Sequence, residues 1–292
     1  NFLIMKLARA VFKTNNVDPK ANSVMVWKTL LSFSLYASIY FAIIFGFTHN
    51  LILYYCLWIL LGLGQAFIGM TLMHDLVHGA YTKNKFIYYF LQIPVILIGV
   101  ESLIWKIEHN VLHHNYTNID GIDQDIHPRF VFRFSENQPR KWFHKYQHIY
   151  ATFIYGLMII EWVTVKDFIK VIKYRKEGFI KTNKEAFFTT LSILIKKAIF
   201  YAVFLIFPLI YIDLPSGVIV SMFITMLVVS GIVLTIIFQT AHVVSACSFF
   251  NIDDDSFKKS WHVHQMLTTA NFSIGNKFIT YLVGSLNYQI EH

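Results

Sequence analysis

His74-Asp75-Leu76-Val77-His78 follows directly on a long apolar run, and this stretch decides how the rest of the chain is interpreted. Two histidines four residues apart lie one turn apart on the same face of a helix. Imidazoles placed in this way can bind one metal ion together. A single pair also arises by chance at helix ends, so the interpretation depends on whether other histidines repeat the pattern.

Other histidines do repeat it. The stretch His109-Asn110-Val111-Leu112-His113-His114 has the same four-residue step and adds a third imidazole. A further histidine follows another apolar run, and Gln289-Ile290-Glu291-His292 ends the chain. The candidate metal ligands and catalytic residues are therefore His74, His78, His109, His113, His114, His242 and His292.

Seven imidazoles exceed the three or four ligands that one zinc ion takes, so they suit two metals. Nitrogen-rich sites bind iron, zinc or copper. The H-E-x-x-H motif of zinc peptidases does not occur, and no Cys or Met lies among the histidines as copper redox sites often require. Two irons bound by these imidazoles, with open coordination positions, could activate dioxygen.

The composition indicates an integral membrane protein. Hydrophobic residues make up 55% of the 292-residue chain and charged residues 14%, against about 25% charged in a soluble domain. The formal net charge is +8, and the basic residues cluster between apolar segments. This pattern favours an anionic lipid surface over nucleic acid. Cys56 and Cys247 form no disulfide framework.

Four apolar runs are long enough to cross a bilayer. The short turns at 49–50 and 213–217 carry no Lys or Arg. The positive-inside rule therefore places the intervening basic segments and both termini in the cytoplasm. The predicted spans are 29–48, 51–73, 191–212 and 218–238, and the basic segments are 1–28, 83–85, 129–148 and 166–187.

Two further apolar segments are expected not to cross the bilayer. Residues 86–104 are interrupted by Pro94 and Gly99, and residues 150–160 are short. Histidines that share one site must lie on one side of the membrane, so an even number of spans must separate them. We therefore expect an all-α membrane protein with four spans in two hairpins, a cytosolic helical cap carrying the histidines, and interfacial or re-entrant segments at 86–104 and 150–160.

Several other polar residues have either a supporting or a plain surface role. Asp75 and Glu291 each adjoin a candidate ligand, where a carboxylate orients an imidazole. They are equally explained as helix-end or surface carboxylates. His264 is a candidate for a supporting contact, whereas His262 is expected to be solvated. Asp120, Asp123 and Asp125 do not form a calcium loop, because the required Gly and closing Glu are missing. His127, His144 and His148 are expected at the surface.

The three histidine boxes, H-D-x-x-H at 74–78, H-N-V-L-H-H at 109–114 and Q-I-E-H at 289–292, resemble those of the membrane fatty acid desaturase family. The last box is similar to the Q-x-x-H-H box of its front-end, acyl-lipid subgroup. The similarity runs from about residue 25 to the end. It implies two irons, dioxygen, four spanning helices and a separate electron donor, either a cytochrome b5-like protein or a ferredoxin with its reductase. Within the similar stretches, Gln239, Asn271 and Gln289 are expected near the ligands.

Two departures from the family pattern shape the expected domain. The third box stops at its first histidine, so residues 1–292 are expected to be a fragment of one desaturase domain whose last ligand lies beyond residue 292. No H-P-G-G haem motif occurs, which favours a bacterial-type member without a cytochrome b5 domain.

The expected activity is oxygen-dependent insertion of a double bond into a fatty acyl chain, carried as acyl-coenzyme A or acyl-lipid. A lipid hydroxylase or ketolase of the same fold remains open, because each reaction begins with hydrogen abstraction. A histidine-lined metal or proton transporter is the alternative from another class. Its ligands should lie at mid-bilayer depth, whereas these clusters lie at span ends and in polar segments.

Overall fold

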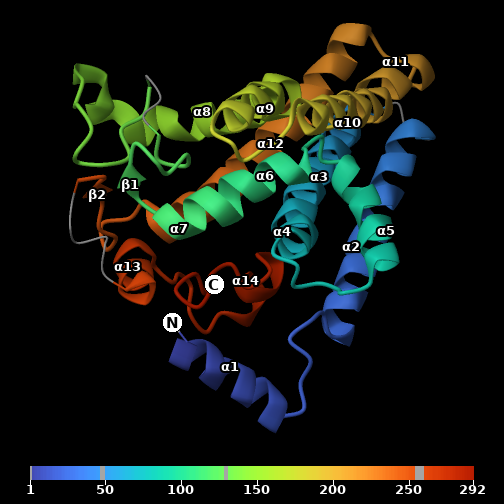
Figure 1. The fold of residues 1–292 in the computed structure, drawn as a ribbon. Helices are drawn as coiled ribbons and strands as arrows, with labels where there is room; N and C mark the ends of the chain where they lie inside the picture. The colour runs from blue at the N-terminus through green and yellow to red at the C-terminus, as the bar shows by residue number, and fades with distance from the viewer. Residues whose placement is uncertain (1, 47–49, 128–130, 254–259) are drawn as a thin grey trace.

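The computed structural model describes residues 2–46, 50–127, 131–253 and 260–292, and these are mostly helical (Figure 1). Five helical segments among them are long and apolar enough to cross a membrane. They are α2 (Ser23–Ile44); α3 (Leu51–Ile68) continued by η1 (Gly69–Met73) and α4 (His74–Val77); η3 (Trp142–Tyr146) continued by α8 (Gln147–Glu161), η4 (Trp162–Lys166) and α9 (Asp167–Lys176); α10 (Asn183–Tyr201) continued by η5 (Ala202–Ile206) and α11 (Phe207–Tyr211); and α12 (Ser216–His242).

Polar side chains fix where the long helices begin. Asn22 accepts a hydrogen bond from the backbone of Met25, Asn50 from Ile52 and Leu53, and Thr182 from Glu185. These N-caps satisfy donors that the first helical turn leaves free. The helices therefore start at polar residues that precede the apolar runs, several residues before hydropathy alone predicts for 29–48 and 191–212.

Each of the four predicted spans corresponds to one of these segments. The predicted turn at 49–50 and the end of the 29–48 span fall partly on residues 47–49, which lie outside the described residues, as do residues 128–130 in the predicted basic segment. The prediction that the apolar segment at 150–160 is short was wrong. A continuous 35-residue helical segment runs from Trp142 to Lys176 and forms a fifth candidate span. No proline interrupts it, and its basic residues pair with neighbours instead of ending the helix.

Residues 86–104 do not form one helix. The helix α5 (Lys85–Ile96) has 12 residues, which is too short to cross a bilayer. Gly99 has a φ of +78°, a left-handed backbone that glycine adopts without strain, and it breaks the chain between helices. The helix α6 (Ser102–Lys106) then begins, and the Glu101 side chain accepts a hydrogen bond from its Leu103 amide. This break turns the chain toward the second histidine box in η2 (Ile107–His113) and α7 (His114–Tyr116).

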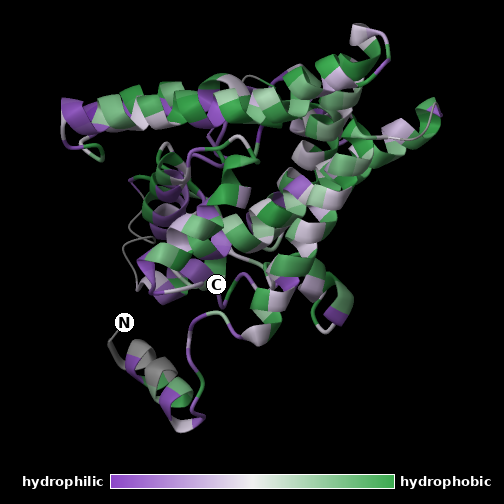
Figure 2. Cartoon of the chain, turned by 90° about the vertical axis from the view of Figure 1, so that its right-hand side faces the viewer, coloured by the Kyte–Doolittle hydropathy of each residue, from purple (hydrophilic) through white to green (hydrophobic). Residues whose placement is uncertain are grey.

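Glycines let the central helices approach closely. A Cβ atom on Gly62 would lie 2.5 Å from the carbonyl oxygen of Met226, so α3 packs directly on the α12 backbone. A Cβ atom on Gly231 would lie 2.8 Å from the Gly156 carbonyl, where α8 crosses α12. Small residues allow such contacts between helices in a membrane. Figure 2 shows apolar residues along most of the long helices.

The prediction of an all-α fold needs one correction. Strand β1 (Ile119–Asp120) pairs in parallel with β2 (Phe250–Asn251), with Ile119 opposite Phe250. Asn118, at a φ of +56°, donates to the carbonyl oxygen of His242 at 2.8 Å. The segment after the second box is thereby joined to the end of α12. The remaining described helices are α1 (Phe2–Thr14), α13 (Trp261–Thr268) and α14 (Lys277–Leu282).

Candidate metal centre

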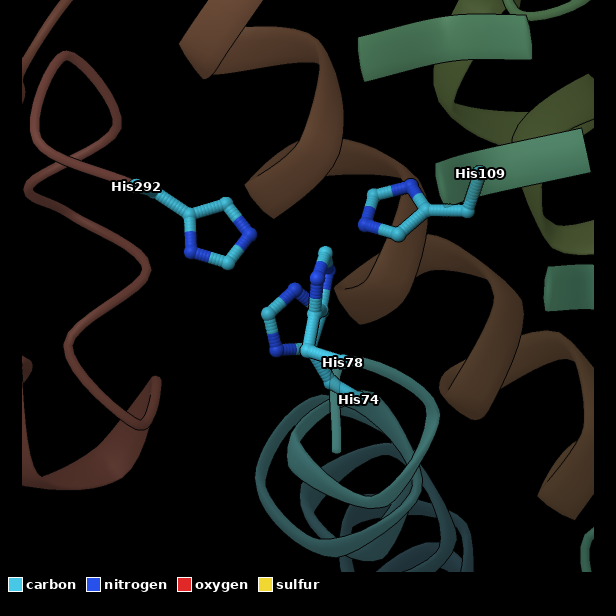
Figure 3. A group of neighbouring side chains, drawn as sticks. All are labelled: His74, His78, His109 and His292. Atoms are coloured by element: carbon cyan, nitrogen blue, oxygen red, sulfur yellow. The ribbon is translucent and has the colours of Figure 1, made fainter. Parts of the chain in front are cut away.

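The first group of histidines comes from three parts of the chain. His74 and His78 lie at the end of the α3–α4 helix, His109 lies in η2, and His292 lies in the C-terminal segment (Figure 3). One ring nitrogen from each lies within 4.8 Å of the other three. The rings of His74 and His78 have centroids 4.5 Å apart, and those of His74 and His292 are also 4.5 Å apart. The four imidazoles surround one space.

The remaining three candidate ligands adjoin this group. The Nε2 atoms of His109 and His114 are 3.2 Å apart, and the Nε2 atoms of His113 and His242 are also 3.2 Å apart. His109, His113 and the Asp125 carboxylate form a second group able to hold a metal ion. The structure thus brings all seven histidines predicted from sequence into one continuous cluster.

Helix geometry explains how the second box supplies three imidazoles. Residues Ile107–His113 form a π-helix, in which hydrogen bonds close between residues five apart. His109 and His114 therefore lie on the same face, although an ordinary helix would separate them. His109 and His113 have stacked rings with centroids 5.6 Å apart. A second π-helical segment, Gly69–Met73, immediately precedes His74. Such segments occur often at functional sites.

Burial lowers the pKa of most of the cluster's histidines that lie outside the spanning segments, so these imidazoles are uncharged. Desolvation, with a smaller contribution from His74, lowers the pKa of His78 to about 3. Desolvation followed by His74 and His78 lowers the pKa of His292 to about 3. Burial and neighbouring imidazoles also lower the pKa of His109 and of His114. Neutral imidazoles have the lone pairs that a metal ion requires.

His113 differs because two carboxylates face it. Burial acts to lower the pKa of His113, but Asp123 and Asp125 outweigh burial and raise it to about 9. The Nδ1–H group donates to Asp123 at 3.1 Å, and Asp125 lies 3.3 Å from the same nitrogen. The Asp123 carboxylate is fully buried. A carboxylate on Nδ1 fixes the ring orientation and leaves Nε2 as the ligand atom.

Sequence reasoning assigned no role to Asp123 or Asp125 at the site. They were considered only as part of a calcium loop, and that loop was rejected. The sequence signal that could have identified them is that both carboxylates lie shortly after the second box along the chain. Trp105 was missed as well, and its indole stacks on the His109 ring at a centroid distance of 4.4 Å. This contact covers one face of the His109 ring.

Three of the residues predicted to support the ligands make contacts within or beside a histidine box, namely Asn271 and Glu291 at the third box and Asp75 at the first. Asn271 donates to the Glu291 carboxylate at 2.8 Å and accepts from the Ile290 amide at 2.9 Å, which fixes the segment that carries His292. The Asp75 carboxylate lies 3.3 Å from Nδ1 of His74. Each of these contacts restrains a candidate ligand or the segment that carries it.

The other predicted supporting residues form hydrogen bonds that involve backbone groups, and none of these bonds reaches the ring of a candidate ligand within the described residues. His264 is buried and bonds the Thr117 carbonyl at 2.8 Å, so it holds the segment after the second box. Gln289 is buried, and its carbonyl accepts from Gln265. The buried Gln239 side-chain oxygen has no partner among the described residues. His127 and His148 are exposed as predicted, whereas His144 and His262 are half-buried.

The cluster fits a pair of metal ions. The Nε2 atoms of His74 and His78 are buried without a hydrogen-bond partner among the described residues. Unsatisfied buried polar atoms carry a free-energy cost that a bound ion removes. Four further Nε2 atoms face one another in two close pairs, and the donors are nitrogen atoms with nearby carboxylates. This donor set exceeds the four ligands of a structural zinc site, and its imidazoles are ligands that iron, zinc and copper all accept.

Comparison with known proteins decides the family. The sequence model described as "Fatty acid desaturase" matches residues 48–292, which include every histidine of the cluster. The chain belongs to the fatty acid desaturase family. It is 31% identical to an acyl-lipid (8-3)-desaturase from Physcomitrium patens over 100% of this chain and 61% of that protein. It is also 31% identical to an sn-1 linoleoyl-lipid 6-desaturase from Arthrospira platensis, over 97% of this chain and 76% of the relative.

An sn-1 linoleoyl-lipid 6-desaturase from Synechocystis is 30% identical over 97% of this chain and 79% of its own length. Across these three relatives the chain spans 61–79% of their lengths. The resemblance to the desaturase family and to its acyl-lipid members, inferred from the three boxes, is therefore confirmed.

In this member of the desaturase family a cavity of about 130 Å³ adjoins the histidine cluster. His109, His113 and His242 form one part of its wall. Apolar side chains from α8, η4 and α12 line much of the remainder, namely Met158, Ile159, Trp162, Leu234 and Phe238. The cavity therefore brings an apolar surface next to the candidate metal ligands.

Asp123 is expected to tune the cluster without binding metal. The Asp123→Asn variant keeps the side chain's size but removes the charge that orients His113, so activity should fall about 10–100-fold. Iron content should fall less than activity. Product formation and bound iron should be measured on the same preparation of full-length enzyme. Wild-type activity in Asp123→Asn would exclude this orienting role, and Asp120→Asn is the control because Asp120 bonds Ser135 and Gln138 instead.

Proposed function

We propose that this chain is the catalytic domain of an acyl-lipid desaturase that introduces a double bond into a fatty acyl chain. The observation that carries this proposal is the convergence of seven imidazoles beside an apolar cavity in a member of this family. The overall reaction removes two hydrogens from neighbouring methylene groups. Dioxygen, two electrons and two protons are consumed with them, and two water molecules form.

Seven residues are proposed as ligands of two irons. Two irons bound there would supply the redox chemistry that activates dioxygen and breaks a C–H bond. The contacts of the free ligands support this role, because close Nε2 pairs and unsatisfied buried Nε2 atoms require a shared cation or proton. The proposed ligands are His74, His78, His109, His113, His114, His242 and His292.

The chain's own residues prepare the site for an apolar substrate. Phe238, Leu234 and Met158 line the cavity beside the ligands and exclude water from an acyl chain. Trp105 restrains His109, and Asp123 restrains His113, so the two rings keep their directions when substrate binds. These restraints keep the ligand rings in one geometry, while the cavity wall positions the acyl chain beside them.

The electron donor is proposed to be a separate protein, such as a cytochrome b5-like protein or a ferredoxin with its reductase.

We propose that the cluster faces the cytoplasm and that four segments span the membrane in two hairpins, leaving Trp142–Lys176 in the membrane surface. That segment is about 50 Å long at 1.5 Å per residue, beyond the roughly 30 Å of a bilayer core.

The two faces of this long segment support an in-plane position. Its exposed side carries apolar residues at helical spacing along its whole length, including Trp142, Phe153, Leu157, Ile169 and Ile172. Its less exposed side is mixed, because it buries Ile159, Val163 and Val171 and also carries Lys166 and Lys170, which bind Glu108 of the second box at 3.0 and 3.3 Å. A helix with an apolar exposed face and basic residues along its other side is suited to the membrane interface.

Labelling can test this topology. Cysteine introduced at the exposed positions Asn115 and Lys181 should react with a membrane-impermeant maleimide from the cytoplasmic side in both cases, in a background with Cys56 and Cys247 replaced by Ser. Cysteine at Asp213 should react only from the opposite side. If 115 and 181 are labelled from opposite sides, the segment between them crosses the membrane and the four-span topology is wrong.

The activity is tested by expressing the full-length protein in a host of known fatty acid composition. New unsaturated chains should appear, and mass spectrometry should locate the double bond. Hydroxylated or oxidised chains without a new double bond would instead indicate a hydroxylase or ketolase. Iron-independent transport of metal or protons without any new lipid product would contradict the enzyme assignment.

A further inference from the structure

A second pocket adjoins the first histidine box and takes no part in the proposed chemistry. Its volume is about 500 Å³, which lies in the range of small-ligand sites. The first turns of α2 form one wall, and Thr71 and Asp75 of the first-box helix form another. The third wall is α14 with the turn that follows it, up to Tyr288. The pocket therefore lies between two segments that carry candidate metal ligands.

Two ammonium groups and several hydroxyls line this pocket. Lys28 bonds the Tyr281 carbonyl and lies over the rings of Phe67 and Tyr281, at 5.0 and 4.5 Å from their centroids. Lys277 is exposed at the pocket's edge. The hydroxyls belong to Thr29, Tyr81, Thr280, Ser285 and Tyr288.

The charge balance of the pocket favours an anion. Within the part of the chain that the structure describes, neither Lys28 nor Lys277 forms an ion pair. Asp75 is the one carboxylate among the residues that line the pocket, and an oxygen of its side chain lies 3.3 Å from His74. Asp75 attracts the Lys28 ammonium without reaching ion-pair distance. The two ammonium groups outnumber this one carboxylate, so the pocket is net positive and attracts phosphate.

The pocket also lies where a lipid head group is expected. It opens at the start of α2, whose other side exposes Trp27 and Leu31, with Trp27 71% exposed. Tryptophan and lysine at a helix end are typical of the membrane–water interface. A molecule held here has its charged part at the interface and its acyl chain beside the first-box helix.

We infer that this pocket binds the phosphate of a glycerophospholipid, and that it is the head-group subsite of the acyl-lipid substrate. The inference deepens the proposed function and rests on it. Lys28 and Lys277 hold the phosphate, and the hydroxyl of Ser285 binds one of its remaining oxygens or the glycerol. A neutral sugar head group gains no charge attraction from the two lysines, so a phospholipid is preferred over a galactolipid with the same acyl chains.

Binding can be measured without catalysis, in anaerobic detergent solution with no reductant. Full-length protein is mixed with dioleoyl phosphatidylglycerol or with dioleoyl monogalactosyldiacylglycerol, and the retained lipid is counted by native mass spectrometry. Because the side chain of Lys277 is exposed, Lys277→Gln should leave folding unchanged. It should weaken phosphatidylglycerol binding about tenfold, because one charge-assisted contact is lost. Lys28→Met should have a similar or larger effect.

The control is Lys184→Gln, an exposed lysine on α10 that should leave binding unchanged. Inorganic phosphate at millimolar concentration should not displace the phospholipid; displacement would mean that a free anion is the ligand. Equal retention of both lipids by the wild type, or unchanged phosphatidylglycerol binding in Lys277→Gln with normal thermal unfolding, would overturn the inference. Lysine-dependent binding without any double-bond formation in the aerobic assay would overturn only the proposed function.

Discussion

Replacing His242 by Ala should abolish desaturation in the full-length enzyme while leaving the protein in the membrane. Its Nε2 lies 3.2 Å from that of His113, and its Nδ1 lies 3.3 Å from the Thr268 carbonyl. A ligand lost from a redox centre removes the oxidant itself, so the loss should exceed the roughly 10–100-fold that follows removal of an orienting contact. Iron content and lipid product should be assayed on one preparation.

His148→Ala is the matched control, because His148 is exposed and lies outside the cluster. It should retain normal iron and activity. His144→Ala is a poorer control than the sequence indicates, since the His144 ring accepts a hydrogen bond from the Lys141 amide. Near-normal iron and product in His242→Ala would remove His242 from the site and leave the three boxes to hold the metals.

The sequence predicted where the long helices lie because two strong signals coincide. Apolar runs of spanning length are rare outside membranes. The turn that joins the two runs of each hairpin has no Lys or Arg, whereas the segments at the other ends of the runs are basic. The run at 150–160 failed this test because hydropathy treats Lys166, Lys170 and Lys173 as the end of an apolar segment. In the structure these lysines lie on the inward face of the same helix and bind Glu108 and Gln124.

The candidate ligands were predictable because histidine spacing on a helix has a direct geometric meaning. Their partners were not. The closeness of His109 to His114 depends on a π-helix, which no residue of Ile107–His113 specifies by itself. Asp123 meets His113 only because the chain turns back after Asn118 at a left-handed residue. Such contacts depend on the path of the loop, which hydropathy and spacing do not encode.

Buried charges in the helical layer were also beyond sequence reasoning. Lys196 and Lys197 lie within the predicted span 191–212, and hydropathy indicates no partner for either. In the structure Lys196 binds the Glu101 carboxylate at 2.8 Å, and Lys197 binds that of Asp167 at 2.9 Å. The first pair ties α10 to the segment that leads into the second histidine box, and the second pair ties it to α9. Charged residues at such depth are rare and usually have a partner.

Lys197→Met should be strongly destabilising. The Lys197 ammonium also donates to the carbonyl oxygens of Gly99 and Trp162, at 3.1 and 2.8 Å, so all of its donors are used. Its side chain is 7% exposed and that of Asp167 is 1% exposed. Removing one partner leaves a buried carboxylate without a counter-charge, which costs about 3–5 kcal/mol of unfolding free energy. Denaturant unfolding in detergent, followed by tryptophan fluorescence, measures the loss.

The double variant Lys197→Met/Asp167→Asn separates charge from packing. It removes both charges together, so it should recover much of the stability that the single change loses, because no ion remains buried alone. Lys184→Met, at an exposed position on the same helix, should change stability by less than about 0.5 kcal/mol. Equal destabilisation of the single and double variants would show that Lys197 stabilises this junction through its carbonyl contacts and packing, not through the charge of Asp167.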